Sequence, residues 1–344
     1  MPESVGDIGE FGLIHRIDKL IHTEGIQCEE VILGIGDDTA CFRPRVGYEL
    51  LVTCDCMVEG RHYLTEYITS LDLGRRAMAL NISDVGAMGG RPRYALVSLG
   101  LRGDTPVRDV EDMYRGFMAE LNPFGGAIIG GNITKSEGGA FIDITLIGEV
   151  EEGRMVCRST ARPGDVVLVT GYPGQAATGL QMLLHAKDKE NLQDHSLTQA
   201  YTTPTHRARE GAAIAATGCA TAMIDTSDGF LGDLGHICEE SGVGADLIQV
   251  KLPLSKALKR AAAALGRDPH DLFFQDSDDY ELIVTCRSEH TEKIQAAVAK
   301  TYEGPVSEVG TITDKAGEIA VIRRDGSRQA LTAKGWDHFA KTDS

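Results

Sequence analysis

The first part of the chain combines apolar residues at helical spacing with short apolar runs that are typical of strands. Near the N-terminus, Phe11, Ile14, Ile17 and Ile21 recur every three or four residues, which predicts an amphipathic helix over 9–22. The rest of this part predicts strands at 31–35, 50–57, 94–101, 126–132 and 141–150, and helices at 72–90 and from Pro106 to about Leu121.

The pattern is interrupted over residues 151–165, where charged residues and a Pro-Gly turn are typical of a domain junction. Alternating strands and helices resume after it. We therefore predict two α/β (α+β) domains, comprising residues 1–152 and 153–344. The second part has predicted strands at 165–170, 221–224, 280–286, 305–312 and 318–323, and predicted helices within 171–184, 230–241 and 288–300.

Composition narrows the choice of partners. The net charge of −17 argues against nucleic acid or an anionic membrane as a partner, because both attract basic surfaces. The eight cysteines contain no C-x-x-C pair, which argues against a structural zinc site and favours reduced thiols. No basic segment followed by an apolar run opens the sequence, and no apolar stretch reaches membrane-spanning length. We expect a cytoplasmic protein.

Acidic residues follow or interrupt apolar runs at several separate places. One acid in such a position is usually a turn or cap residue, and "GIGDD" taken alone fits a solvated turn equally well. Several together indicate a site for hard cations, for which Mg²⁺ with oxygen ligands is the default, and bound Mg²⁺ commonly holds polyphosphate. The residues alone therefore suggest an enzyme that binds a magnesium nucleotide. The acids concerned are Asp37, Asp38, Asp55, Asp84, Asp225 and Asp228.

Two glycine-rich segments could bring backbone N–H groups close to a phosphate. "GGNIT" at 130–134 could bind an anion or form a plain turn. "GYPGQAATG" at 171–179 could seat a phosphate or allow close packing of a helix against a strand. The sequence contains no Walker-type phosphate loop and no protein-kinase signature, which excludes those two ways of binding a nucleotide.

The order of the motifs resembles the thiamine-monophosphate kinase family, part of the superfamily of aminoimidazole ribonucleotide synthetase and selenophosphate synthetase. The resemblance covers nearly the whole chain and rests on "GIGDDTA", "TCDCMVEGRHY", "ALNISDVGAMGGRP", "GGNIT", "AMIDTSDGFLGDLGHICEESGVGADL", "DDYEL" and "KGWDHF". It implies a two-domain aminoimidazole ribonucleotide synthetase-like fold and a homodimer whose N-terminal halves form a shared β-barrel. Residues 1–152 would then bind ATP and metal and mediate dimerisation, and residues 153–344 would form a C-terminal α/β domain.

The resemblance also implies an activity, which is Mg²⁺-dependent phosphoryl transfer from ATP to thiamine monophosphate, giving thiamine diphosphate and ADP. Matching metal positions are Asp38, Thr53, Cys54, Asp55, Asp84, Asn132, Asp225 and Asp228, with Asp38, Asp225 and Asp228 as the catalytic candidates. Matching ATP contacts are Gly131, Asn132, Arg158 and Ser227, and matching substrate contacts are His62, Asp278 and Trp336.

Two departures from the family pattern lie at expected ligand positions. A third, Cys54 and Cys56 in place of the small hydroxyl residues that usually flank Asp55, mostly spares ligation by the backbone. Asn132 stands where "GGDTT" has a metal-binding aspartate, so one charge is missing. The usual "GGEDYEL" is "QDSDDYEL" here, so Asp276 and Ser277 replace glycines and Asp278 replaces a glutamate. Two alternatives to the kinase therefore stay open. One is a paralogue that uses ATP to phosphorylate or activate another small molecule, and the other is a non-catalytic nucleotide-binding homodimer.

Overall fold

The computed structural model describes residues 2–185 and 196–332 and divides into two compact units. Unit 1 comprises Met1–Gly86 and Gly90–Gly153, and unit 2 comprises Ala87–Gly89 and Arg154–Ser344. In the described part of the chain, no helix is both long enough and apolar enough to cross a membrane.

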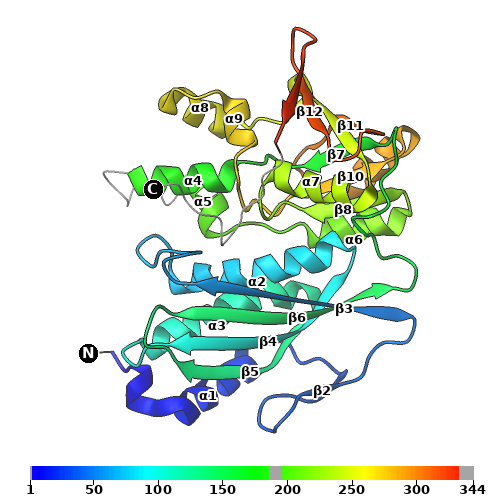
Figure 1. Ribbon diagram of the computed structural model, residues 1–344. Helices are drawn as coiled ribbons and strands as arrows, with labels where there is room; N and C mark the ends of the chain where they lie inside the picture. Colours follow the sequence, from blue (N-terminus) through cyan, green and yellow to red (C-terminus); the bar gives the residue numbers. More distant parts are fainter. Residues whose placement is uncertain (1, 186–195, 333–344) are drawn as a thin grey trace. The chain divides into compact units, whose positions relative to one another are not determined.

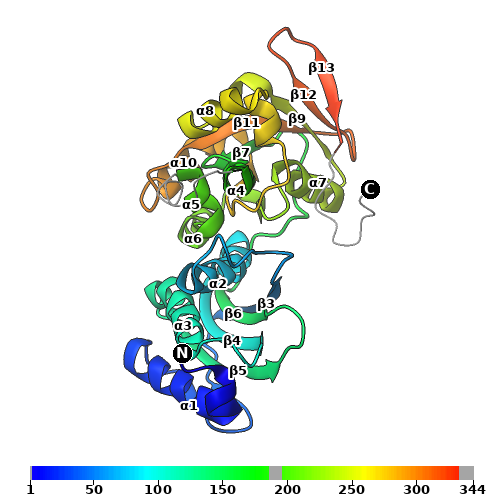
Figure 2. The ribbon, with the colours of Figure 1, turned by 90° about the vertical axis from the view of Figure 1, so that its left-hand side faces the viewer.

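Unit 1 is built on a four-stranded sheet in the order β3-β6-β4-β5, in which only the β4–β5 pair is parallel. Figures 1 and 2 show α2 and α3 on one face of this sheet. The elements are α1 (Val5–Glu24), β1 (Val31–Leu33), β2 (Cys41–Phe42), β3 (Tyr48–Val58), α2 (Ser70–Ala87), β4 (Arg91–Leu101), α3 (Val107–Leu121), the 3-10 turn η1 (Asn122–Phe124), β5 (Ala127–Lys135) and β6 (Phe141–Glu151).

The first helix exists as expected, and its buried face matches the predicted one only in part. Leu13, Ile17 and Ile21 are buried, whereas Phe11 is 83% exposed. Spacings of three and four residues fit more than one stripe on a helix, and the stripe through Leu13 is the one that packs inward. Phe11 instead lines a cavity that is described below.

Strand β3 forms one edge of this sheet, since β6 is its only neighbour among the described residues. Because side chains alternate along a strand, one set faces the helices and the other faces away from them. Thr53 is hydrogen-bonded to a side chain of α2, whereas Val52 on the other face is 67% exposed. Exposed apolar side chains on an edge strand are a common feature of protein interfaces. The set on the outer face consists of Leu50, Val52, Cys54, Cys56 and Val58, all exposed.

Unit 2 is built on a seven-stranded sheet in the order β13-β12-β9-β11-β7-β10-β8, in which only the β9–β12 pair is parallel. Its helices are α4 (Gln175–His185), α5 (Ser196–Thr202), α6 (Ala208–Thr217), α7 (Phe230–Ser241), α8 (Lys256–Leu265), α9 (Pro269–Phe273) and α10 (Thr291–Val298), with 3-10 turns η3 (Gln249–Lys251) and η4 (Ser288–His290). Its strands are β7 (Val166–Thr170), β8 (Ala220–Asp225), β9 (Gly244–Ile248), β10 (Leu282–Cys286), β11 (Val306–Thr313), β12 (Ile319–Ile322) and β13 (Arg328–Leu331).

The central strands of unit 2 are buried on both faces. All five residues of β7 and all five of β10 are buried, which explains why their sequences read as continuous apolar runs. Val167 and Val169 join a core that contains Phe230 of α7. Val166 and Leu168 join a second core on the opposite face. The sheet therefore separates two apolar layers. The polar residues that could bind ligands lie in the loops at its strand ends.

The start of α4 is capped by a residue far away in the sequence. The carboxylate of Asp279 accepts hydrogen bonds from the backbone N–H groups of Gly174 and Ala176, at 2.6 and 2.8 Å. The hydroxyl of Ser277 accepts another from Ala177, at 3.1 Å. Burial raises the pKa of Asp279 to about 6, against the lowering effect of these hydrogen bonds. The N–H groups that could have held a phosphate at "GYPGQAATG" are therefore occupied by side chains.

We predict that Asp279→Ala lowers the free energy of unfolding by about 1–3 kcal/mol, because it removes the acceptor for two N–H groups at the start of α4. Asp279→Asn keeps one carbonyl acceptor and is expected to lose less. Urea unfolding followed by circular dichroism measures both variants. Equal stability of Asp279→Ala and the unmodified protein would show that the cap contributes nothing.

Candidate active site

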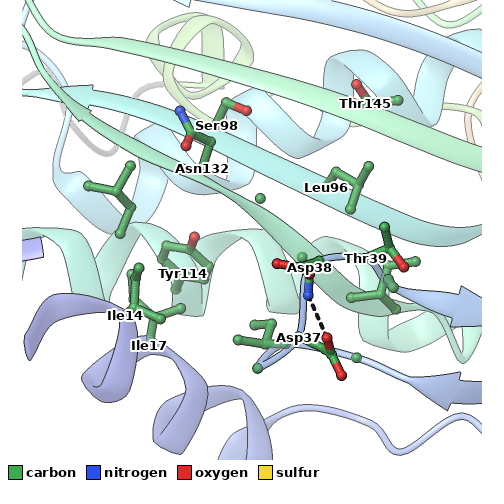
Figure 3. A pocket seen from close by; sticks show the side chains of 18 of the residues that line it. Ile14, Ile17, Asp37, Asp38, Thr39, Leu96, Ser98, Tyr114, Asn132 and Thr145 are labelled. Atoms are coloured by element: carbon green, nitrogen blue, oxygen red, sulfur yellow. Dashed lines mark hydrogen bonds between the residues drawn. The ribbon is translucent and has the colours of Figure 1, made fainter. Parts of the chain in front are cut away.

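Unit 1 contains a cavity of about 930 Å³ that brings together residues from distant parts of the sequence. Asp38 lies on its wall in the loop between β1 and β2, and Gly131 and Asn132 lie on its wall in β5. Figure 3 shows Asn132 beside Ser98 of the neighbouring strand β4, with Tyr114 of α3 also lining the cavity. Three of the predicted ATP- and metal-binding residues thus share one cavity.

The two neighbouring acids of "GIGDD" differ in what they do. The backbone N–H of Asp38 donates to Oδ1 of Asp37 at 2.8 Å (Figure 3), so the carboxylate of Asp37 holds the turn. The turn itself needs Gly36, whose φ of +121° is a conformation that other residues rarely adopt. Both acids are exposed. The carboxylate of Asp38 takes no part in this bond and is the one suited to contact a cation.

Gly131 is required by the packing of β5 against β4. With φ at +158°, a Cβ atom at this position would lie 1.9 Å from the carbonyl oxygen of Val97. The close approach leaves the backbone of β5 open to the cavity next to Asn132, which is exposed. An amide oxygen can coordinate Mg²⁺, although it supplies no charge.

A second polar group of unit 1 lies between β3 and α2. Thr53 Oγ1 donates a hydrogen bond to Oδ2 of Asp84, and the backbone N–H of Asp55 donates to Oδ1 of Asn81 at 3.2 Å. Asn81 and Asp84 are three residues apart on α2 and so occupy one face of that helix. Cys54 points to the other face of the sheet, where its Sγ lies 3.2 Å from Oδ1 of Asp143. Thr53, Asp55 and Asp84 therefore form a local set of oxygen donors, and Cys54 can join it only through its backbone.

Unit 2 concentrates acids at the end of β8 and the start of α7. Asp225 and Asp233 are each 1% exposed, and the backbone N–H of Asp228 donates to Oδ2 of Asp233 at 3.1 Å. Asp228, Asp233 and His236 each place a possible ligand atom within 4.8 Å of the others. Carboxylate oxygens are the donors that Mg²⁺ prefers, so the composition of this group fits that ion.

The electrostatics of this group favour a cation. Burial raises the pKa of Asp233 well above its ordinary value, and the negative charges of Asp225 and Asp228 raise it further. The positive charge of Arg158 acts in the opposite direction. A bound divalent cation would compensate these neighbouring charges, as a buried acid otherwise has to bind a proton.

Comparison with known proteins places this arrangement in a family. Models for "AIR synthase related protein" match residues 36–150 with the N-terminal domain and residues 162–323 with the C-terminal domain. The chain is 31% identical over 335 residues to thiamine-monophosphate kinase of Bacillus subtilis, covering 96% of this chain and 99% of that protein. The chain belongs to the thiamine-monophosphate kinase family.

Solved structures agree with this membership. The crystal structure of thiamine-monophosphate kinase from Stenotrophomonas maltophilia has a TM-score of 0.78 and 33% identity, covering 93% of this chain and 97% of that one. The structure of AaThiL complexed with AMPPCP and TMP has a TM-score of 0.74 and 34% identity, covering 97% and 98%. The two-domain mixed α/β fold predicted from the sequence, of the aminoimidazole ribonucleotide synthetase type, is confirmed.

The loop that departs from the family pattern is firmly held. The backbone of Thr226, next to Asp225, exchanges hydrogen bonds with residues 280 and 281, and its Oγ1 accepts from the N–H of Glu281 at 3.0 Å. Glu281 in turn forms a buried two-point ion pair with Arg207, with both distances 2.7 Å. Asp278 therefore lies in a chain segment that is attached both to α4, through Ser277 and Asp279, and to the acidic loop.

The remaining residues predicted to contact ATP or the substrate lie in different surroundings. Nδ1 of His62 accepts a hydrogen bond from the N–H of Val58 at 3.0 Å, which puts the proton of the neutral ring on Nε2. Arg158 and Ser227 are exposed, and the carbonyl oxygen of Arg158 accepts from Ser241. Trp336 lies outside the described residues. The roles of all these residues stay predictions.

Sequence reasoning missed Tyr114, Asp233 and His236 as site residues. Tyr114 is buried in α3 like an ordinary core residue, and it also borders the cavity. Asp233 and His236 are three residues apart in "FLGDLGHI", a spacing that places both on one face of a helix. That spacing, directly after the acids of "DTSDG", is the sequence pattern that could have indicated both residues.

We predict that Gly131→Ala destabilises the protein by about 3 kcal/mol or more, since the added Cβ would overlap the backbone of Val97. Gly138→Ala is the matched control, because nothing lies within 4 Å of a Cβ at that position. Thermal unfolding of both variants tests the difference. The explanation is wrong if the two substitutions have the same effect.

Proposed function

We propose that this protein is a thiamine-monophosphate kinase, which transfers a phosphoryl group from ATP to thiamine monophosphate and gives thiamine diphosphate and ADP. The observation that carries the proposal is the full-length relationship to such kinases, including AaThiL complexed with AMPPCP and TMP. The cavity of unit 1 and the acidic group of unit 2 support it, since Asp38 and Asn132 line the cavity and two carboxylates belong to the acidic group, and such oxygen atoms suit Mg²⁺.

The cavity of unit 1 has features suited to each part of a nucleotide. Ile14, Ile17 and Tyr114 supply an apolar part that could accommodate a base. Asp38 and Asn132 supply oxygen atoms for a metal that accompanies the phosphates, and Gly131 keeps the backbone accessible. We propose that ATP binds here with Mg²⁺.

Phosphoryl transfer requires alignment and charge neutralisation more than covalent help from the protein. Bound Mg²⁺ would supply neutralisation of the phosphate oxygens. In unit 1 we assign Mg²⁺ binding to Asp38 and Asn132 at the cavity and to Thr53, Asp55 and Asp84 beside α2. In unit 2 we assign it to Asp225 and Asp228. The backbone of Cys54 completes the proposed ligands.

We propose that a further set of side chains orients the phosphates and the substrate. Arg158 has a planar guanidinium that can donate two parallel hydrogen bonds to one phosphate, and Ser227 lies beside Asp228. Nδ1 of His62 accepts a hydrogen bond from the N–H of Val58, and we assign the Nε2–H of the ring to an acceptor on the substrate. Asp278 is a carboxylate acceptor on a firmly held segment, and Trp336 completes the proposed substrate contacts.

The reaction is tested by measuring ADP release from Mg-ATP with and without thiamine monophosphate, and thiamine diphosphate by chromatography. We expect ADP release to depend on thiamine monophosphate. Asp228→Asn should lower kcat/KM by about two orders of magnitude, because it removes one charge from the metal ligands. Asp314→Asn, an exposed acid on the β11–β12 turn, is the matched control and should retain full activity. ADP release that does not respond to thiamine monophosphate would contradict the proposal and favour another small-molecule acceptor.

We further propose that two copies of the chain associate through the outer face and edge of β3, forming a shared barrel. The support is the row of exposed residues at Leu50, Val52 and Val58 on an eleven-residue edge strand. A cytoplasmic location, and the lack of nucleic-acid and membrane partners, stay predictions from composition.

Val52→Lys places a charge in the middle of that face and is expected to convert a dimer to a monomer, because a charge would have to be desolvated in the interface. Val250→Lys is the matched control, since Val250 of η3 is similarly exposed at 63%. Sedimentation velocity distinguishes the species. A dimer that persists in Val52→Lys, or an unmodified protein that is already monomeric, argues against this interface.

A further inference from the structure

The segment 275–277 packs directly against the acidic loop of unit 2. Gly229 follows Asp228 and has φ at +107°. A Cβ atom at Gly229 would lie 2.9 Å from the Cα of Asp276 and from the carbonyl oxygen of Gln275, and 3.1 Å from the backbone nitrogen of Ser277. The two backbones are therefore in contact, and glycine at 229 is what permits it. This contact brings Asp276 next to Asp228.

Asp276 adds negative charge at a place that is already acidic. The charge of Asp228 acts on the carboxyl group of Asp276, as it also acts on that of Asp233. Asp228 thus has acidic neighbours from two separate segments, which are α7 and the loop before β10. Asp276 is exposed, so a hydrated cation can reach it. Acids placed together in this way repel one another, and a shared divalent cation would offset that repulsion.

We propose that Asp276 is an additional acidic group of the cation site built on Asp228, and that it raises the affinity of this site for divalent cations. The inference rests on the proposed function, since that function assigns a metal to Asp228. Residue 276 is also one of the two positions at which the sequence replaces an expected glycine by a polar side chain. The added carboxylate gives this chain a charge that the glycine-containing pattern lacks.

The test measures Mn²⁺ binding to the full-length protein by electron paramagnetic resonance of the free ion, which requires no turnover. Asp276→Asn removes the charge and keeps the Cβ atom, and Asp276→Gly removes the whole side chain. Asp314→Asn makes the same change of charge on the β11–β12 turn, away from the acidic loop in sequence. Thermal unfolding of every variant shows whether the fold is retained.

We expect both substitutions of Asp276 to raise the Kd for Mn²⁺ by about fivefold, as loss of one nearby charge in a partly solvated site requires. Asp314→Asn should leave the Kd unchanged. The proposal is overturned if the Kd changes less than about twofold in both Asp276 variants, or equally in Asp314→Asn. In the kinase assay, the concentration of Mg²⁺ at half-maximal rate should rise in parallel. If none of the proteins phosphorylates thiamine monophosphate, the proposed function fails, and the Mn²⁺ measurement still decides the role of Asp276.

Discussion

Repulsion between carboxylates at the end of β8 is the constraint on which the rest of unit 2 depends. Asp225 and Asp233 are almost completely buried, and Asp228 lies close to Asp233. An acid in such surroundings favours the protonated state unless a cation compensates its charge. Before any cation binds, the fold must therefore hold these acids together, and the unfavourable surroundings raise the pKa of Asp233.

The holding elements are backbone contacts and one buried ion pair. Thr226 joins the acidic loop to residues 280 and 281, where Tyr280 has a left-handed backbone conformation with φ at 53°. The two-point pair between Glu281 and Arg207 fixes the other side of that segment. Removing one partner of such a buried pair typically costs about 3–5 kcal/mol. These contacts give the proposed metal ligands a rigid support, and positioned ligands are what phosphoryl transfer requires.

In unit 1, backbone packing and a tight turn position the candidate ligands. Gly131 allows β5 to approach β4 closely, and the turn around Gly36 separates the roles of Asp37 and Asp38. The departure at Asn132 therefore lies in an otherwise intact cavity wall. The second departure lies in segment 276–278, where Ser277 contributes to the cap of α4. Both departures change charge while the backbone supports remain.

The sequence by itself determined the class of fold and the family, and it indicated most of the acids of the proposed site. Apolar runs such as β7 and β10, and the ordered motifs, depend on local chemistry that can be read along the chain. Several elements were not predicted, including α6 and α8, whose buried faces consist largely of small residues, and the five-residue strand β9. Only the tertiary structure decided which face of α1 is buried, what caps α4, and that Asp233 and Asp276 lie beside Asp228. These are contacts between segments distant in sequence, and packing of the whole chain determines them.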